Sequence, residues 1–154
     1  VFRTHPRQSH HARNSEKMKW DESYNTNVLV IDNDHKKLFE LTNKLEELSE
    51  DEVPKAHLIN NQIERLLDYT VYHFDREKDL MTKHDIVPLN QHIAEHDEFV
   101  AVAKEAYANW KQRGDVEDLK SLVRYLWNWL VEHIMGSDME LAESLLLVDG
   151  INET

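Results

Sequence analysis

The sequence predicts an all-α protein, an up-down-up-down antiparallel four-helix bundle with an extended N-terminal arm. Apolar residues recur at steps of three and four over several long stretches, which is the spacing of one face of a helix. Only 3 glycines and 3 prolines are present, so the chain has few turns and a many-stranded sheet is disfavoured. Short connections between the helical stretches imply antiparallel neighbours. At 154 residues, we expect one domain.

The first part of the chain differs in composition from the rest. Residues 1–19 are polar, lack periodicity and contain five basic residues but only one acidic residue. We interpret them as a disordered basic arm, derived in part from cloning if Met18 is the natural start. Its histidines could bind stray metal, but a flexible tail is the better interpretation. Residues 20–154 then make up the bundle, with residues 20–31 leading into the first helix.

Four helical stretches can be assigned from their start and stop signals. The first begins after Asp32, a good N-cap residue. The second starts near Pro54, which suits a first helical turn, and runs to about Lys83. A proline-containing linker leads into the third, which ends at Gly114, and Asp115 can cap the fourth.

Composition excludes several classes of function. The net charge of −12 repels phosphate backbones, so we expect no nucleic-acid partner. With no cysteine, disulfides, thiolate metal sites, iron–sulfur clusters and covalent haem attachment are all excluded. No apolar run approaches the roughly 18 residues of a membrane span, and no secretion signal opens the chain. We therefore expect a cytoplasmic protein without a membrane partner.

Each of the four predicted helices places a histidine on its core-facing stripe, where leucine would be usual. Residues four apart on a helix are neighbours, so HIAEH in the third helix and HFDRE in the second each direct two donors to one point. Asp138 lies five residues after His133, roughly 140° away from that face. Gly136 between them can loosen the turn, and a π-bulge is one way to bring Asp138 inward. The inward set is His35, His73, Glu77, His92, His96, His133 and Asp138.

Each of these signals is weak alone, since a single inward histidine is usually a hydrogen-bonded core residue. Together they are specific, because burying seven unpaired polar groups costs several kcal/mol and no inward Arg or Lys is evident. A metal centre would satisfy all seven. Imidazole and carboxylate without thiolate suit iron, zinc, manganese or copper. Seven donors exceed the needs of one ion, so we expect two ions with two bridging carboxylates and a solvent-derived bridge. His57 and His84 are expected at the surface.

The motifs IDNDH, HFDREKDLM, HIAEHDEF and WLVEHIMGSD resemble those of the hemerythrin family, specifically its bacterial members, in order and approximate spacing. All seven ligand positions of the family are filled. The resemblance implies a non-haem di-iron centre with two Fe ions and an oxo or hydroxo bridge. His92, His96 and His133 would hold one iron and His35 and His73 the other, with Glu77 and Asp138 as bridges. It implies reversible O2 binding, as hydroperoxide at the open iron, for storage, delivery or scavenging.

The resemblance also assigns an apolar pocket for the gas. Its positions are occupied by Leu38, Phe74, Trp129, Leu130 and Ile134. Without the ligands, each of these would be ordinary core. Two departures from the family affect loops only: Asn27 stands where glycine is frequent, and Val87 precedes Pro88 where an aromatic residue is usual.

Two other functions compete with gas binding. A di-iron oxidase or peroxidase on a similar bundle typically uses Glu-x-x-His on two helices, and this chain has no such motif. We therefore favour binding over turnover and expect no enzyme. The other alternative is a gas or redox sensing domain of a signalling protein, but no output domain is evident. The expected partner is a small gas ligand, O2 or also NO, and whether the protein has a protein partner is left open by the sequence.

Overall fold

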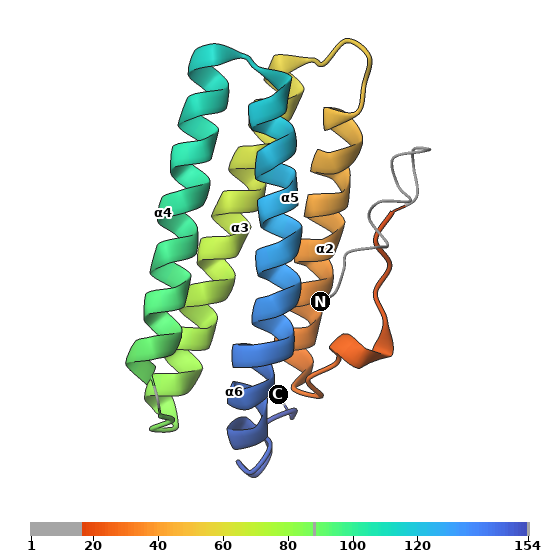
Figure 1. The fold of residues 1–154 in the computed structure, drawn as a ribbon. Helices are drawn as coiled ribbons and strands as arrows, with labels where there is room; N and C mark the ends of the chain where they lie inside the picture. Colours follow the sequence, from red (N-terminus) through yellow and green to blue (C-terminus); the bar gives the residue numbers. More distant parts are fainter. Residues whose placement is uncertain (1–16, 88, 154) are drawn as a thin grey trace.

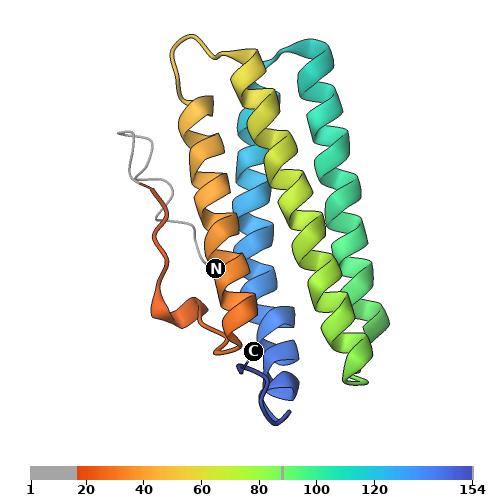
Figure 2. The ribbon, with the colours of Figure 1, turned by 180° about the vertical axis from the view of Figure 1, so that it is seen from behind.

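The computed structural model describes residues 17–87 and 89–153, and most of the predicted arm therefore lies outside the described residues. Four long helices run antiparallel: α2 (Leu29–Ser49), α3 (Ala56–Lys83), α4 (Leu89–Arg113) and α5 (Val116–His133). Each packs against the next along the chain, and α2 also contacts α5, which closes the bundle (Figures 1 and 2). No strand occurs in the described part of the chain. The predicted four-helix bundle is confirmed.

Short elements flank the bundle. A 3₁₀ turn, η1 (Glu22–Tyr24), precedes α2, and a π-helical turn, η2 (Ile134–Asp138), connects α5 directly to α6 (Met139–Leu145). In Figure 1, α6 continues below α5 at the end of the bundle where α2 begins. Met18, which the sequence placed in the arm, is instead held by two hydrogen bonds with the side chain of Asn43.

The fourth helix starts as the sequence predicts, but the first does not. The Asp115 carboxylate accepts a hydrogen bond from the backbone N–H of Glu117, so the predicted cap of α5 is confirmed. The predicted cap at Asp32 is wrong, because α2 already begins at Leu29. The buried Asp32 carboxylate reaches back instead and accepts hydrogen bonds from the backbone N–H groups of Thr26 and Asn27.

The C-terminal segment completes the start of α2. The side-chain oxygen of Asn152 accepts a hydrogen bond from the backbone N–H of Leu29 at 2.8 Å, and its amide donates to the carbonyl of Asn27. This satisfies one of the N–H groups that every helix leaves unpaired at its start. Apolar residues of α6 form a small second core with residues of α2, α3 and the leading segment. Its buried members are Val28, Ile31, Met81, Leu141, Ala142 and Leu145.

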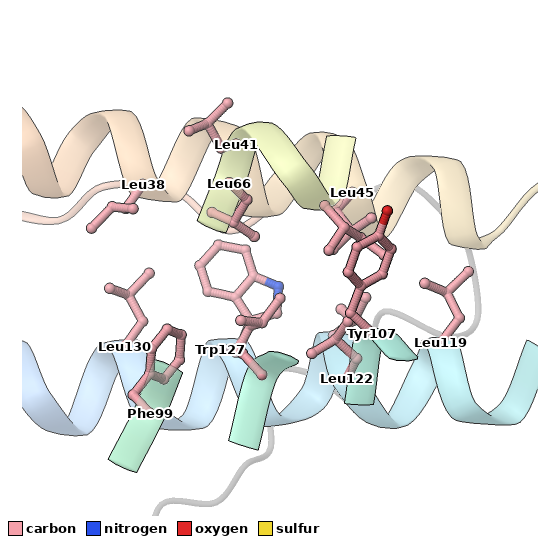
Figure 3. Close-up of a cluster of buried hydrophobic side chains, with 14 of the residues drawn as sticks. Leu38, Leu41, Leu45, Leu66, Phe99, Tyr107, Leu119, Leu122, Trp127 and Leu130 are labelled. Atoms are coloured by element: carbon pink, nitrogen blue, oxygen red, sulfur yellow. The ribbon is translucent and has the colours of Figure 1, made fainter. Parts of the chain in front are cut away.

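The main hydrophobic core fills the other end of the bundle. In Figure 3, side chains of α2 and α5 project toward one another with Trp127 between them. Tyr107 is buried on α4, whereas its neighbour Ala106 is only half-buried. None of the described helices combines the length and the apolar character that crossing a membrane requires.

Candidate metal centre

The antiparallel arrangement brings the seven inward polar residues to one level of the bundle. His35 lies near the start of α2, and His73 and Glu77 lie toward the end of α3. The histidines of α4 lie in its first turns, and His133 is the last residue of α5. Because alternate helices run in opposite directions, these positions meet between the two apolar cores. All seven side chains are buried, with exposed fractions of 0 to 7%.

The donor atoms form two groups that share two residues. One group contains three histidines, His92, His96 and His133, together with both carboxylates. The other contains two histidines, His35 and His73, and the same two carboxylates, Glu77 and Asp138. Within each group all donor atoms lie within 4.8 Å of one another. Each group has the nitrogen and oxygen donors that could hold a metal ion, and the two carboxylates are common to both groups.

Asp138 reaches the centre through the π-helical turn. A π-helix has more residues per turn than an α-helix, so a residue five positions after His133 returns to the inward face. The π-bulge that the sequence suggested is therefore present, at Ile134–Asp138. A Cβ atom added at Gly136 would meet no atom within 4 Å. The turn therefore does not depend on glycine for space.

Several buried nitrogen and oxygen atoms that could bind a metal have no hydrogen-bond partner among the described residues. They are both nitrogens of His35, Nε2 of His73, both oxygens of Glu77 and Oδ2 of Asp138. His73 Nε2 and Glu77 Oε2 lie 2.9 Å apart, so they are close but not aligned as a hydrogen bond. Buried polar groups without partners are costly and rare. In the three-histidine group, His92 Nε2 pairs with Asp138 Oδ1 at 3.1 Å and His96 Nε2 with His133 Nε2 at 3.0 Å. The unpartnered imidazole and carboxylate atoms that remain fit a bound cation.

The charges of the centre compensate one another through shifted pKa values. Burial lowers the pKa of His73, but the carboxylates of Glu77 and Asp34 outweigh burial and raise it to about 10. Burial also lowers the pKa of His92, but the carboxylates of Asp138 and Glu77 outweigh burial and raise this pKa to about 10. The neighbouring histidines lower the pKa of Glu77 despite its burial. In the metal-free protein, protons on histidines therefore balance the carboxylates, and a bound cation would displace those protons.

Two carboxylates outside the donor groups contact the outer nitrogens of histidines, and sequence reasoning missed both. Asp34 Oδ2 accepts a hydrogen bond from Nδ1 of His73 at 2.8 Å. Glu95 Oε1 lies 3.1 Å from Nδ1 of His133. A carboxylate that accepts from Nδ1 fixes the tautomer and leaves Nε2 free for a metal. Asp34 and Glu95 immediately precede His35 and His96 in the sequence, but each contacts a histidine on another helix.

Aromatic rings hold two of the histidines in place. The ring of Phe74 stacks on His96, with centroids 3.7 Å apart and an interplanar angle of 3°. Trp129 stacks on His133 at 4.2 Å and 15°. Imidazole orientation in this group is therefore set by packing as well as by hydrogen bonds.

An apolar cavity of about 20 Å³ adjoins the centre. Both histidines of the smaller group line it, whereas only His133 of the larger group does. Four of the five residues predicted for the gas pocket are part of its wall, namely Leu38, Phe74, Trp129 and Leu130. Ile134 is fully buried but is not among the lining residues.

Two threonines in the cavity wall present no free hydroxyl proton. Thr42 donates to the carbonyl of Leu38 and Thr70 to that of Leu66, both at 2.7 Å. The remaining wall is mostly aliphatic and aromatic. The cavity has room for about one small molecule and offers it few polar partners.

Five histidines and two carboxylates in the core of an antiparallel helix bundle, without thiolate, define a non-haem metal-binding protein. The family model for the hemerythrin HHE cation binding domain matches residues 26–145. The chain therefore belongs to the hemerythrin family, and it is a non-haem iron domain of that family.

Named relatives agree with this assignment. The chain is 32% identical to bacteriohemerythrin of Methylococcus capsulatus over 122 residues, which cover 79% of this chain and 91% of the relative. It is 33% identical to a hemerythrin-like protein of Naegleria gruberi over 121 residues, covering 79% and 87% of the two chains. The crystal structure of a leucine-to-alanine mutant of hemerythrin superposes with a TM-score of 0.71 at 29% identity, covering 83% of this chain and 96% of that chain.

Proposed function

We propose that this chain holds two iron ions and binds O2 reversibly, for storage, delivery or scavenging. The observation that carries the proposal is the sharing of Glu77 and Asp138 by two groups of buried donors. In this assignment His92, His96 and His133 hold one iron, and His35 and His73 hold the other. The two carboxylates bridge the ions.

The unequal donor groups support a gas site at the second iron. Three histidines serve one group but only two serve the other, so the second ion has one protein donor fewer. Both of its histidines, His35 and His73, line the apolar cavity. A small apolar molecule in the cavity would lie next to the ion that has room for it.

The protein contributes an environment for this chemistry. Two iron ions held by these residues would supply the two electrons that reversible O2 binding requires. Leu38, Phe74 and Leu130 are buried and give the cavity an apolar wall, which disfavours bulk water there. Because the hydroxyls of Thr42 and Thr70 are already bonded to backbone carbonyls, they do not offer protons to a bound gas. A site that excludes water and proton donors favours release of the gas unchanged over its reduction.

Metal analysis and one pair of optical spectra test the proposal. We expect two irons per chain and, after reduction, a charge-transfer band that appears with O2 and disappears when O2 is removed. The exposed His57 provides the control, because His57→Ala should change neither result. One zinc and no iron would reject the metal assignment. Irreversible oxidation without the band would reject O2 carriage and favour an oxidase or a sensor.

A further inference from the structure

Asp34 connects the metal centre to a group of residues on α3. Its side chain is almost fully buried, and its two oxygens accept hydrogen bonds from three different side chains. Oδ2 accepts from His73 Nδ1 and from Arg76 Nε, both at 2.8 Å. Oδ1 accepts from the hydroxyl of Tyr69 at 2.9 Å. The carboxylate that holds His73 is therefore itself held by a cation and a phenol.

Arg76 is fixed in this position. Its Nη2 donates to the hydroxyl of Tyr72 at 2.7 Å, and its guanidinium lies 5.0 Å from the centroid of the Tyr72 ring. Arg76 Nε and Asp34 Oδ2 form an ion pair at 2.8 Å, so the guanidinium compensates the charge of the carboxylate.

The corresponding carboxylate on the other side of the centre is not compensated in this way. Glu95 lies 3.1 Å from His133 Nδ1 and accepts a hydrogen bond from the Ser137 hydroxyl at 2.6 Å. It is half-buried rather than buried. Within residues 17–87 and 89–153, no Lys or Arg forms an ion pair with Glu95. The two histidine–carboxylate pairs therefore differ, and the compensated one belongs to His73, in the group that has only two histidines.

This difference has a chemical consequence. A carboxylate that accepts from the outer N–H of an imidazole raises the basicity of the imidazole and its electron donation to a bound metal. A guanidinium on the same carboxylate oxygen withdraws part of that negative charge. We infer that Asp34 positions His73, and that Arg76 and Tyr69 limit how strongly Asp34 makes His73 donate to the metal beside the cavity. The inference rests on the proposed iron centre.

Substitutions of Asp34 and of Arg76 should then shift the reduction potential of the iron centre in opposite directions. Asp34→Asn keeps an oxygen acceptor but loses the charge, so His73 donates less and the potential rises. Arg76→Gln leaves Asp34 uncompensated, so His73 donates more and the potential falls. Tyr69→Phe changes no charge but removes one hydrogen bond, and it should lower the potential by less than Arg76→Gln does. The measurement is a mediated redox titration of iron-loaded protein.

Arg113→Gln is the matched control. Arg113 forms a two-point ion pair with Asp118 near the other end of the bundle, so this substitution should leave the potential unchanged. A second readout is Co²⁺ binding by metal-free protein. Loss of the carboxylate should weaken binding in Asp34→Asn about tenfold, whereas Arg76→Gln should weaken it less.

The outcomes separate the inference from the proposed function. Opposite shifts for Asp34→Asn and Arg76→Gln, with a small fall for Tyr69→Phe, support the inference. Shifts in the same direction, or none, in protein that holds two irons would overturn it and leave the iron assignment standing. An unchanged potential in Tyr69→Phe would mean that the shifts come only from the charges of Asp34 and Arg76 acting at a distance. That result would overturn the role proposed for the hydrogen bonds to Asp34. Wild-type protein without iron would overturn both.

Discussion

His35 Nε2 and Asp138 Oδ2 lie 2.9 Å apart in the core, yet neither atom has a hydrogen-bond partner among the described residues. One residue comes from the start of α2 and the other from the π-helical turn after α5. A buried imidazole nitrogen and a carboxylate oxygen this close would normally form a hydrogen bond. Their misalignment indicates that they converge on a third body, for which a bound cation is the natural choice.

Glu77→Ala should release both metal ions together, because Glu77 belongs to both donor groups. His35→Ala removes a donor from the smaller group only, so it should lower the occupancy of one ion more than that of the other. Elemental analysis of the purified variants measures this. Glu64→Ala is the control, since Glu64 is an exposed residue of α3 that bonds Tyr107. Full metal content in Glu77→Ala would show that its carboxylate is not a bridge.

The stability of the metal-free protein should be greatest in mildly acidic solution. The pKa of His73 and that of His92 are raised from 6.5 to about 10, so their contribution is complete below pH 6.5 and is lost as the pH rises toward 10. The pKa values of Glu77 and Asp138 are lowered from 4.5 and 3.8, so their contribution is present above these values and is lost as the pH falls further. Thermal unfolding of metal-free protein, measured at about one-unit pH steps between pH 3 and 10, checks both the acid and the alkaline loss of stability.

The metal-loaded protein provides the comparison for that experiment. A bound cation replaces the protons of His73 and His92, so the alkaline loss of stability should disappear. If the thermal unfolding midpoint of metal-free protein does not change between pH 6.5 and 10, protons on His73 and His92 do not balance the buried carboxylates.

Leu38→Ala should shorten the life of the oxygenated protein. Leu38 lines the apolar cavity, and its truncation opens space through which water can reach the gas site. Leu45→Ala is the matched control, because Leu45 is a buried leucine of the same helix that does not line the cavity. Both variants should lose about 2–5 kcal/mol of unfolding free energy. Decay of the oxygenated spectrum should accelerate several-fold in Leu38→Ala alone, and equal decay in the two would show that the cavity wall does not protect the gas.

Asn27 occupies the backbone conformation that favours glycine, with φ of 74°. Asn27→Gly should therefore leave the unfolding free energy unchanged or raise it slightly. Asn27→Ala should lower it by about 1 kcal/mol, because alanine lacks the local hydrogen bonding that lets asparagine adopt this conformation. Urea denaturation of the two variants gives the order directly, and an alanine variant more stable than the glycine variant would contradict it.

Much of the fold follows from local patterns in the sequence. The apolar spacing of the four helices and the Asp115 cap depend on residues within a few positions of one another. The start of α2 could not be predicted in the same way, because Asp32 looks like a cap locally but bonds a loop that folds back over it. The residue that does accept a hydrogen bond from the first N–H of α2, at Leu29, is Asn152, which lies at the other end of the chain.

The inward polar residues were also predictable, since histidine and carboxylate at leucine positions interrupt a regular stripe. The outer carboxylates Asp34 and Glu95 were not, because each contacts a histidine of a different helix, which local spacing does not reveal.

The sequence by itself determined the helices, the identity of the seven inward donors and, through its motifs, the family. Only the tertiary structure decided how those donors divide into two groups, which of them line the cavity, and that Arg76 compensates Asp34 beside His73. The physical reason is the range of the interactions. Periodicity and capping act over one or two turns of a helix, whereas donor grouping depends on the rotation and level of each packed helix relative to the others.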